Sequence, residues 1–275
     1  MTRLSITIVC FFLFLNCGTK KQYPKVGLVE INGTIIESEE IIKNLNYFYL
    51  RDDIEGILVR VNSPGGGVAP SQEIYEKIKN IRENSSKPIV VSMSSIATSG
   101  GYYVSIGADS IIANPGSITG SIGVIMGYPT INKLMDLIGI NYTTIKSGKY
   151  KDSGSPFRES QNTDNQYFKD VVNELYSQFK EDVSSERNLS EFEINEIAQG
   201  QIFSGRQAFK LGLVDRLGTF EDAIWLIGRM AGFNSRPSLV RIPEKRLSLI
   251  DAIIGEIKVN LGTDYMFGLP EYKYK

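Results

Sequence analysis

The 275-residue chain contains no histidine. This absence excludes every site in which a histidine acts as a base, an acid or a zinc ligand, including the Ser-His-Asp triad. If the protein hydrolyses a bond, its general base must be a lysine, a carboxylate or a terminal amine. One missing residue type therefore removes most of the familiar hydrolase mechanisms.

Cysteine and net charge are also scarce. The two cysteines, Cys10 and Cys17, both lie near the N-terminus, so the body of the protein has neither disulfide nor thiol chemistry. The 30 basic and 31 acidic residues give a net charge of −1. Because no basic surplus exists, we do not expect the protein to bind nucleic acid. The 42% hydrophobic and 22% charged content is that of an ordinary folded domain.

Residues 1–17 have the pattern of an export signal. One arginine precedes residues 6–15, which are almost wholly apolar but too few to cross about 30 Å of hydrocarbon as a helix. The segment ends at Cys17, as in a lipoprotein signal, so we expect lipidation of that cysteine; a plain secretory signal and a short uncleaved anchor are the alternatives. Each interpretation places the body outside the cytoplasm and next to a membrane. With lipidation we expect a membrane-anchored protein of the cell envelope, in which the two lysines that follow Cys17 add a second weak attachment.

Strand-like and helix-like segments alternate along the first half of the chain. Buried strands are expected at residues 26–31, 56–61 and 88–93, helices at 37–50, 70–84, 99–108 and 130–138, and further short strands at 110–113, 122–126 and 142–145. This alternation predicts an α/β fold with a mainly parallel sheet and surrounding helices.

The second half of the chain has mainly helical patterns. Helices are expected at residues 162–184, 190–198, 204–211 and 219–230, the last capped by Thr219 with Asp222 three positions on. Residues 246–262 form an amphipathic pattern, which we expect to pack on its own domain, although a membrane or a neighbouring subunit is also possible. The predicted organisation is a spacer at 18–25, one domain at 26–262 and a tail at 263–275.

A glycine-rich segment, Ser63–Gly67, directly follows one predicted strand. Its glycines permit a ligand to approach bare backbone N–H groups, as an oxyanion hole requires. The segment lacks the Lys-Ser/Thr ending of a phosphate-binding P-loop. A simple turn between a strand and a helix is the alternative interpretation.

A second candidate is Ser99, which Gly100 and Gly101 follow at the predicted start of a helix. A serine hydroxyl at this position is a candidate nucleophile, and the N–H of Gly100 is a candidate second oxyanion donor. The alternative is that Ser99 merely caps the helix, although two glycines in a first turn weaken the helix and call for another reason.

The base is harder to choose, because Lys146, Lys149 and Lys151 all lie in one polar loop. A lysine acts as a base near neutral pH only where burial or a neighbouring cation favours its neutral form. Each of the three is equally well interpreted as a solvated surface charge. The residues alone do not decide among them.

Four motifs in this order resemble the signal peptide peptidase A family of bacterial serine peptidases, family S49. They are Ser-Pro-Gly-Gly at 63–66, Ser-Gly-Gly-Tyr-Tyr at 99–103, Gly-Ser-Ile-Thr-Gly-Ser-Ile-Gly-Val at 116–124 and Lys-Ser-Gly-x-Tyr-Lys at 146–151. Segments 203–208 and 211–215 resemble later motifs of the family, and the likeness runs from about residue 26 to residue 232. The resemblance implies the ClpP/crotonase-like fold.

The resemblance also implies roles for individual residues. Ser99 falls on the nucleophile, Lys151 on the base, and Ser121 on a serine that hydrogen-bonds the lysine. The oxyanion site falls on the backbone N–H of Gly66 (or of Gly65) and of Gly100.

The implied activity is that of a serine endopeptidase with a Ser–Lys dyad. Its implied substrates are cleaved signal peptides and other hydrophobic or unfolded segments, it needs no metal or cofactor, and it assembles as a ring-like homo-oligomer. This chain departs from the family in one respect, because members typically carry a transmembrane anchor where this sequence has a short signal ending at Cys17.

Two other functions fit the same fold. One is a crotonase-like acyl-CoA enzyme. The expected extracytoplasmic location disfavours this function, because CoA is a cytoplasmic cofactor. The other is a non-catalytic scaffold, which the presence of every expected catalytic residue disfavours.

Overall fold

The computed structural model describes residues 23–242 and 271–273. The predicted signal with Cys17, most of the spacer and the amphipathic segment 246–262 lie outside the described residues.

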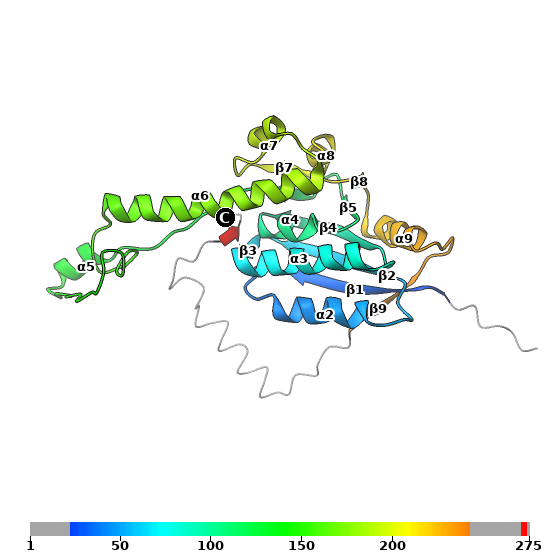
Figure 1. Ribbon diagram of the computed structural model, residues 1–275, viewed down its shortest axis with the longest axis horizontal. Coiled ribbons are helices and arrows are strands. Elements are labelled where there is room, and N and C mark those ends of the chain that lie inside the picture. Colours follow the sequence, from blue (N-terminus) through cyan, green and yellow to red (C-terminus); the bar gives the residue numbers. More distant parts are fainter. Residues whose placement is uncertain (1–22, 243–270, 274–275) are drawn as a thin grey trace, which may run out of the picture.

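One large, mainly parallel sheet forms the centre of the molecule (Figure 1). Its strands are β1 (Lys25–Asn32), β2 (Gly56–Ser63), β4 (Ile89–Thr98), β5 (Ser110–Ala113), β6 (Ile118–Gly120), β7 (Ile202–Ser204), β8 (Arg216–Leu217) and β9 (Ser238–Arg241). The main path runs β7-β6-β4-β2-β1-β9, while β5 pairs with β4 and β8 pairs with β5. Every pairing in this sheet is parallel except that of β6 with β7. The predicted α/β class is therefore confirmed.

Helices cover both faces of this sheet. They are α2 (Glu39–Tyr49), α3 (Val68–Asn84) and α4 (Gly100–Ser105) on one face, and α9 (Phe220–Met230) on the other. Alternate strand residues face the two layers: Val29 and Val59 pack in the larger core with α2 and α3, whereas Leu28 and Leu58 pack with Ile224 of α9. Burial on both faces explains why the strands read as continuous apolar runs.

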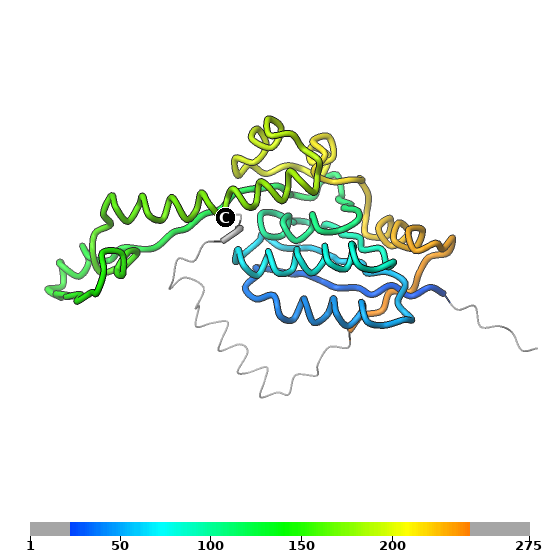
Figure 2. The backbone as a smooth tube through the Cα atoms, viewed as in Figure 1, coloured from blue at the N-terminus to red at the C-terminus, as the bar shows by residue number. Residues whose placement is uncertain are grey.

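An elongated arm projects from this body (Figures 1 and 2). It contains α5 (Asn132–Leu137), the irregular segment that follows α5, and the outer part of α6 (Asn162–Arg187). With 26 residues, α6 is roughly 39 Å long at 1.5 Å per residue. The helices α7 (Glu191–Ile197) and α8 (Gly205–Lys210) return the chain to the body.

Two predicted strands are wrong. Residues 122–126 and 142–145 form no strand, and β6 lies just before the first of these segments. Both segments enter or lie within the arm and join none of the strands of the main sheet, so their apolar pattern does not become a strand. The predicted cap of α9 is confirmed, since Thr219 and Asp222 form a reciprocal capping box.

Several short strands were not predicted, among them β7, β8 and β9 in the second half of the chain, where helices were expected. The glycine-rich segment, expected as a turn, contains β3 (Gly65–Gly67), and the expected C-terminal tail contains β10 (Glu271–Lys273). Over residues 23–242 and 271–273, no helix has both the length and the apolar character that a membrane span needs.

Candidate active site

Ser99 lies at the junction between β4 and α4 in a strained backbone conformation. Its φ of 54° and ψ of −117° are unusual for a residue with a side chain and cost about 1–3 kcal/mol. Its N–H donates to the carbonyl of Gly120 at 2.8 Å, and its side chain is only 1% exposed. The hydroxyl does not cap α4 and has no hydrogen-bond partner within the described part of the chain. The helix-cap interpretation is therefore wrong, and the buried hydroxyl is left for another partner.

In the glycine strand β3, the N–H of Gly66 points away from Ile35, the residue with which this strand pairs. The N–H of Ile35 donates to the carbonyl of Gly65 at 2.9 Å, and the N–H of Gly67 donates to the carbonyl of Ile35 at 2.8 Å. The N–H of Gly65 donates to Ser63 Oγ at 3.0 Å. Because backbone groups alternate along a strand, the N–H of Gly66 points to the opposite edge. Of the two candidate oxyanion donors in this strand, the N–H of Gly65 is already hydrogen-bonded to Ser63 Oγ, whereas the N–H of Gly66 makes no hydrogen bond with Ile35.

Gly66 and Gly100 approach each other so closely that no side chain fits between them. A Cβ on Gly100 would lie 3.2 Å from Gly66 N and 2.5 Å from Ser71 Oγ. The first N–H groups of a helix have no partner within the helix, so that of Gly100, the first residue of α4, is available. The serine and two adjacent backbone amides thus share one small volume, as an oxyanion site requires.

Side chains that the sequence did not single out hold this arrangement together. Thr98 Oγ1 donates to the carbonyl of Pro64 at 3.2 Å, which ties the end of β4 to the glycine segment. Ser71 Oγ donates to the carbonyl of Gly67 at 2.8 Å. The only sequence signal for either residue is the position of Thr98 next to Ser99.

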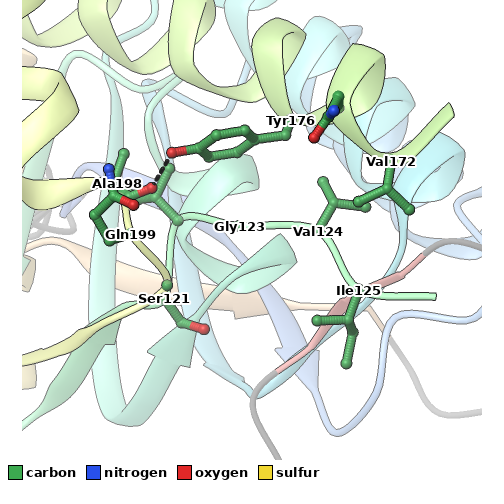
Figure 3. A pocket seen from close by; sticks show the side chains of 11 residues that line it. Ser121, Gly123, Val124, Ile125, Val172, Tyr176, Ala198 and Gln199 are labelled. Carbon is green, nitrogen blue, oxygen red and sulfur yellow. Dashed lines mark hydrogen bonds between the residues drawn. The ribbon is translucent and has the colours of Figure 1, made fainter. Parts of the chain in front are cut away.

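Ser121 is one of the residues that line a cavity (Figure 3). It directly follows Gly120, whose carbonyl holds the Ser99 N–H, and it has a positive φ of 53°. The cavity measures about 450 Å³ and is lined by Ser121, Ile122, Gly123, Val124, Ile125, Val172, Asn173, Tyr176, Ala198, Gln199 and Gly200. Figure 3 shows Tyr176 along one wall, where its hydroxyl donates to the carbonyl of Ala198. Burial raises the pKa of this tyrosine, so it remains a neutral donor. No motif in the sequence indicated this cavity.

The three candidate lysines have different surroundings. Lys146 Nζ lies 2.6 Å from Asp152 Oδ1, and Lys149 Nζ lies 5.0 Å from the centre of the Tyr150 ring. Lys151 is exposed, and its amine makes no hydrogen bond or ion pair with the described residues. Lys146 and Lys149 therefore interact with residues of their own loop, whereas the amine of Lys151 does not. The sequence alone did not separate the three lysines in this way.

One chain does not bring Lys151 to Ser99. The irregular segment 138–161, which carries Lys151, lies at the outer end of the arm, whereas α4 lies in the body (Figures 1 and 2). The unpartnered Ser99 hydroxyl agrees with this separation. No hydrogen bond joins Ser121 and Lys151 either, so the three predicted catalytic residues are not assembled within the described part of a single chain.

A charge cluster fixes the loop that carries Lys151. Arg158 Nε donates to Asp152 Oδ2 at 2.9 Å, and Arg158 Nη1 donates to Asp164 Oδ2 at 2.6 Å. These hydrogen bonds hold the pKa of both carboxyls below their usual range. Asp164 is 2% exposed and also forms a capping box with Gln161 at the start of α6. The loop therefore has a defined shape although it projects from the body.

The fold and the site together define a class of protein. A mainly parallel α/β body, a strained serine between a strand and a helix, and two adjacent backbone amides are the parts of a serine hydrolase with a ClpP-like fold. In agreement, residues 29–115 match the sequence profile described as Clp protease.

Comparison with known proteins identifies the family. Residues 81–232, more than half of the chain, match the profile of peptidase family S49. A putative protease of Synechocystis is 39% identical over 76% of this chain and 76% of its own length. A putative protease of Methanocaldococcus jannaschii is 43% identical over 69% of this chain, and a putative signal peptide peptidase of Enterococcus faecium is 38% identical over 73%. The chain spans 60% and 62% of these last two relatives. The protein belongs to peptidase family S49 and is a serine-type peptidase.

Proposed function

We propose that this protein is a homo-oligomeric endopeptidase in which Ser99 of one copy works with Lys151 of a neighbouring copy. One observation carries the proposal: the Ser99 hydroxyl is buried and unpartnered beside two amide donors, while Lys151 stands on an arm directed away from it. Membership of family S49 supports the peptidase activity, and the Lys-Ser-Gly-x-Tyr-Lys motif supports the choice of lysine.

The chemistry follows from these positions. The neutral amine of Lys151 takes the proton of the Ser99 hydroxyl, and Ser99 Oγ attacks the carbonyl carbon of the substrate peptide bond. The negative charge that develops on the carbonyl oxygen is stabilised by the N–H groups of Gly66 and Gly100. The protonated lysine then gives its proton to the departing amine, and water, deprotonated by the same lysine, hydrolyses the acyl-enzyme. Ser121 orients the lysine by a hydrogen bond.

The exposed position of Lys151 supports the pairing between copies. A lysine serves as a base only in its neutral form, which burial favours, and contact with a second copy would provide that burial. The arm also exposes a run of large apolar side chains, namely Leu134, Leu137, Ile138, Ile140 and Ile145. A concentration of exposed apolar residues of this kind marks a contact surface.

We further propose that the substrates are cleaved signal peptides and other apolar, unfolded segments. The cavity beside Ser121 supports this choice, because Ile122, Val124 and Val172 give it apolar walls suited to an apolar substrate side chain. The name of the Enterococcus faecium relative, a putative signal peptide peptidase, points to the same class of substrate.

Coexpression of two inactive variants tests the composite site. We expect Ser99→Ala and Lys151→Ala each to abolish hydrolysis of an apolar peptide, whereas Lys146→Ala retains it. In a random mixed oligomer of the two inactive variants, about a quarter of the sites regain both residues. Activity near that fraction supports the pairing between copies. Full activity of either single variant contradicts the dyad, and an inactive mixed oligomer contradicts the pairing.

The extracytoplasmic, membrane-anchored location is also a proposal, which rests on residues 1–17. We expect Cys17 to carry lipid, so the full-length protein incorporates labelled palmitate and sediments with membranes. Cys17→Ser removes the label and Cys10→Ser, the matched control, keeps it. A label that survives Cys17→Ser contradicts lipidation at this residue.

A further inference from the structure

The two tyrosines of the Ser-Gly-Gly-Tyr-Tyr motif, Tyr102 and Tyr103, take no part in the proposed chemistry. Both lie in α4, directly after the glycines that bring this helix close to the glycine strand, and both side chains are fully buried. Phenylalanine would fill nearly the same space without a polar group. Because burying a hydroxyl costs stability unless it is hydrogen-bonded, the two hydroxyls call for an explanation.

Each hydroxyl joins α4 to a different part of the fold. Tyr102 Oη donates to the carbonyl oxygen of Leu213, between α8 and β8, at 3.0 Å. Tyr103 Oη donates to Asp182 Oδ2 in the inner part of α6. Burial raises the pKa of Tyr102, which keeps its hydroxyl protonated as a donor. The short helix α4 is thus held by two segments that come much later in the chain.

Aromatic packing also fixes the Tyr103 side chain. Its ring stacks on that of Tyr75 in α3, with centroids 5.1 Å apart, and makes an edge contact with the ring of Phe179 in α6, with centroids 4.6 Å apart. Figure 1 shows α4 between these two helices. The position of Tyr103 is therefore set by α3 and α6 together.

The backbone of α4 connects this side chain to Ser99. The N–H of Tyr103 donates to the carbonyl of Ser99 at 2.8 Å, and the N–H of Ser99 donates to the carbonyl of Gly120 at 2.8 Å. Ser99 has a strained backbone, and such strain persists only where the surrounding structure fixes the residue firmly. A shift of α4 would release the strain and would move the Ser99 hydroxyl and the N–H of Gly100 away from Gly66.

We propose that Tyr102 and Tyr103 are positioning residues for Ser99. Their hydroxyls hold α4 from two sides, and Asp182 is the anchor on the helix that also forms part of the arm. The glycines let α4 approach the glycine strand, and the tyrosines prevent it from moving back. The positioning role rests on the proposed function of Ser99, whereas the anchoring of α4 is independent of it.

Substitutions that remove one oxygen atom test this role. Tyr102→Phe and Tyr103→Phe each remove one hydroxyl and keep the ring. Tyr75→Phe is the matched control, because it removes a hydroxyl that donates to another carboxylate of α6, Glu186, at 3.0 Å but that belongs to α3. Steady-state peptide hydrolysis gives kcat and KM, and thermal unfolding gives the stability.

We expect Tyr102→Phe and Tyr103→Phe each to lower kcat about three- to tenfold with little change in KM, since the lost hydrogen bond acts on the transition state and not on substrate binding. Tyr75→Phe should lower the unfolding temperature by a comparable amount and leave kcat unchanged. An equal loss of kcat in the Tyr75 and Tyr103 variants, or normal kcat in either the Tyr102 or the Tyr103 variant, overturns the inference.

Variants of Asp182 test the other partner of the Tyr103 hydrogen bond. Asp182→Ala should reproduce the effect of Tyr103→Phe, whereas Asp182→Asn, whose amide oxygen can still accept the hydrogen bond, should retain most of the activity. The double variant Tyr103→Phe/Asp182→Ala should lose no more than either single variant, because both changes remove one and the same interaction. A double variant in which the two losses multiply would contradict the shared role.

Hydrogen–deuterium exchange separates this inference from the proposed function. In Tyr103→Phe we expect faster exchange of the backbone amides of residues 99–105, measured by mass spectrometry, and in Tyr75→Phe we expect no change there. Unchanged exchange in Tyr103→Phe overturns the anchoring of α4, whatever the activity. Full activity of Ser99→Ala overturns the proposed nucleophile and the positioning role with it, and the exchange result alone then decides whether α4 is anchored as described.

Discussion

At the scale of single residues, the site depends on where side chains are absent. Gly100 leaves room for Gly66 and Ser71, and a Cβ on Gly101 would lie 2.8 Å from the carbonyl oxygen of Ser63. These two glycines allow the first turn of α4 to press against the glycine strand, with the strained Ser99 between them. The close approach explains why glycines stand where they weaken a helix.

We expect Gly100→Ala to lower kcat/KM for peptide hydrolysis about a hundredfold or more, since it displaces an oxyanion donor. The new Cβ would lie 2.5 Å from Ser71 Oγ and 3.2 Å from Gly66 N, so Ser71 must turn away and Gly66 must shift relative to Gly100. Gly116→Ala is the matched control, because a Cβ there meets no atom within 4 Å. Steady-state kinetics together with thermal unfolding separate a local effect from misfolding. Normal turnover by Gly100→Ala would refute the oxyanion assignment.

The residues alone indicate the proposed nucleophile more clearly than the proposed base. Ser99 followed by two glycines after a strand is physically unusual, so it indicated a site without further knowledge. Lys146, Lys149 and Lys151 share one loop, and no rule of spacing separates them. Their separation depends on which of them finds a partner in the folded loop, and that information exists only in three dimensions.

At the scale of elements, the arm is a second structural unit with its own stabilising interactions. Arg158 joins Asp152, next to Lys151, with Asp164 in the first turn of α6. The loop and the long helix are thereby connected, so the position of Lys151 depends on α6. A charge cluster that is largely screened from water has a larger effect than a surface ion pair.

We expect the carboxyls of Asp152 and Asp164 to titrate below their ordinary value of about 3.9, because hydrogen bonds from Arg158 favour the charged form. Because these two carboxyls have lower pKa values in the folded than in the unfolded protein, their charged forms stabilise the fold above about pH 4. This stabilisation is lost as the pH falls through the lowered pKa values. Carboxyl NMR titration measures both groups. In Arg158→Ala both midpoints should rise toward about 3.9, whereas Arg236→Ala, which removes an exposed pair with Glu221, should leave them unchanged. Ordinary midpoints in the native protein would contradict this account of the loop.

Element prediction succeeded where local rules decide and failed where pairing decides. The capping box at Thr219 is set by residues three positions apart, and it forms as predicted. Residues 142–145 have the composition of a strand, yet they lie in the arm and pair with none of the described strands. The strands β3 and β10 were missed for the complementary reason, because each is made a strand by a distant partner.

At the scale of the whole molecule, the protein consists of a body that holds Ser99 and an arm that carries Lys151 and an apolar surface. Leu137 and Ile145 are 84% and 98% exposed at the arm. Family and fold class could be predicted from motifs and from the alternation of elements. The separation of the body from the arm could not be predicted, because the order of motifs along a chain does not say how far apart they lie in the folded protein.

We expect the double variant Leu137→Asp/Ile145→Asp to dissociate the oligomer and to lose most of the peptidase activity, because charges on an apolar contact surface oppose its burial. Leu50→Asp, at a similarly exposed leucine of the body (75%), serves as the control and should change neither property. Light scattering during size-exclusion chromatography reports the assembly state, and peptide hydrolysis reports the activity. A fully active monomer would refute the composite site.

The outward position of Lys151 has a consequence for the life of the protein in the cell. Under the proposed pairing, a newly made copy carries a nucleophile without a base, so it is harmless to the unfolded chains around it during export. Activity appears only where copies accumulate, and it rises more steeply than the amount of protein. Under this pairing, the assembly of copies is itself the step that activates the enzyme.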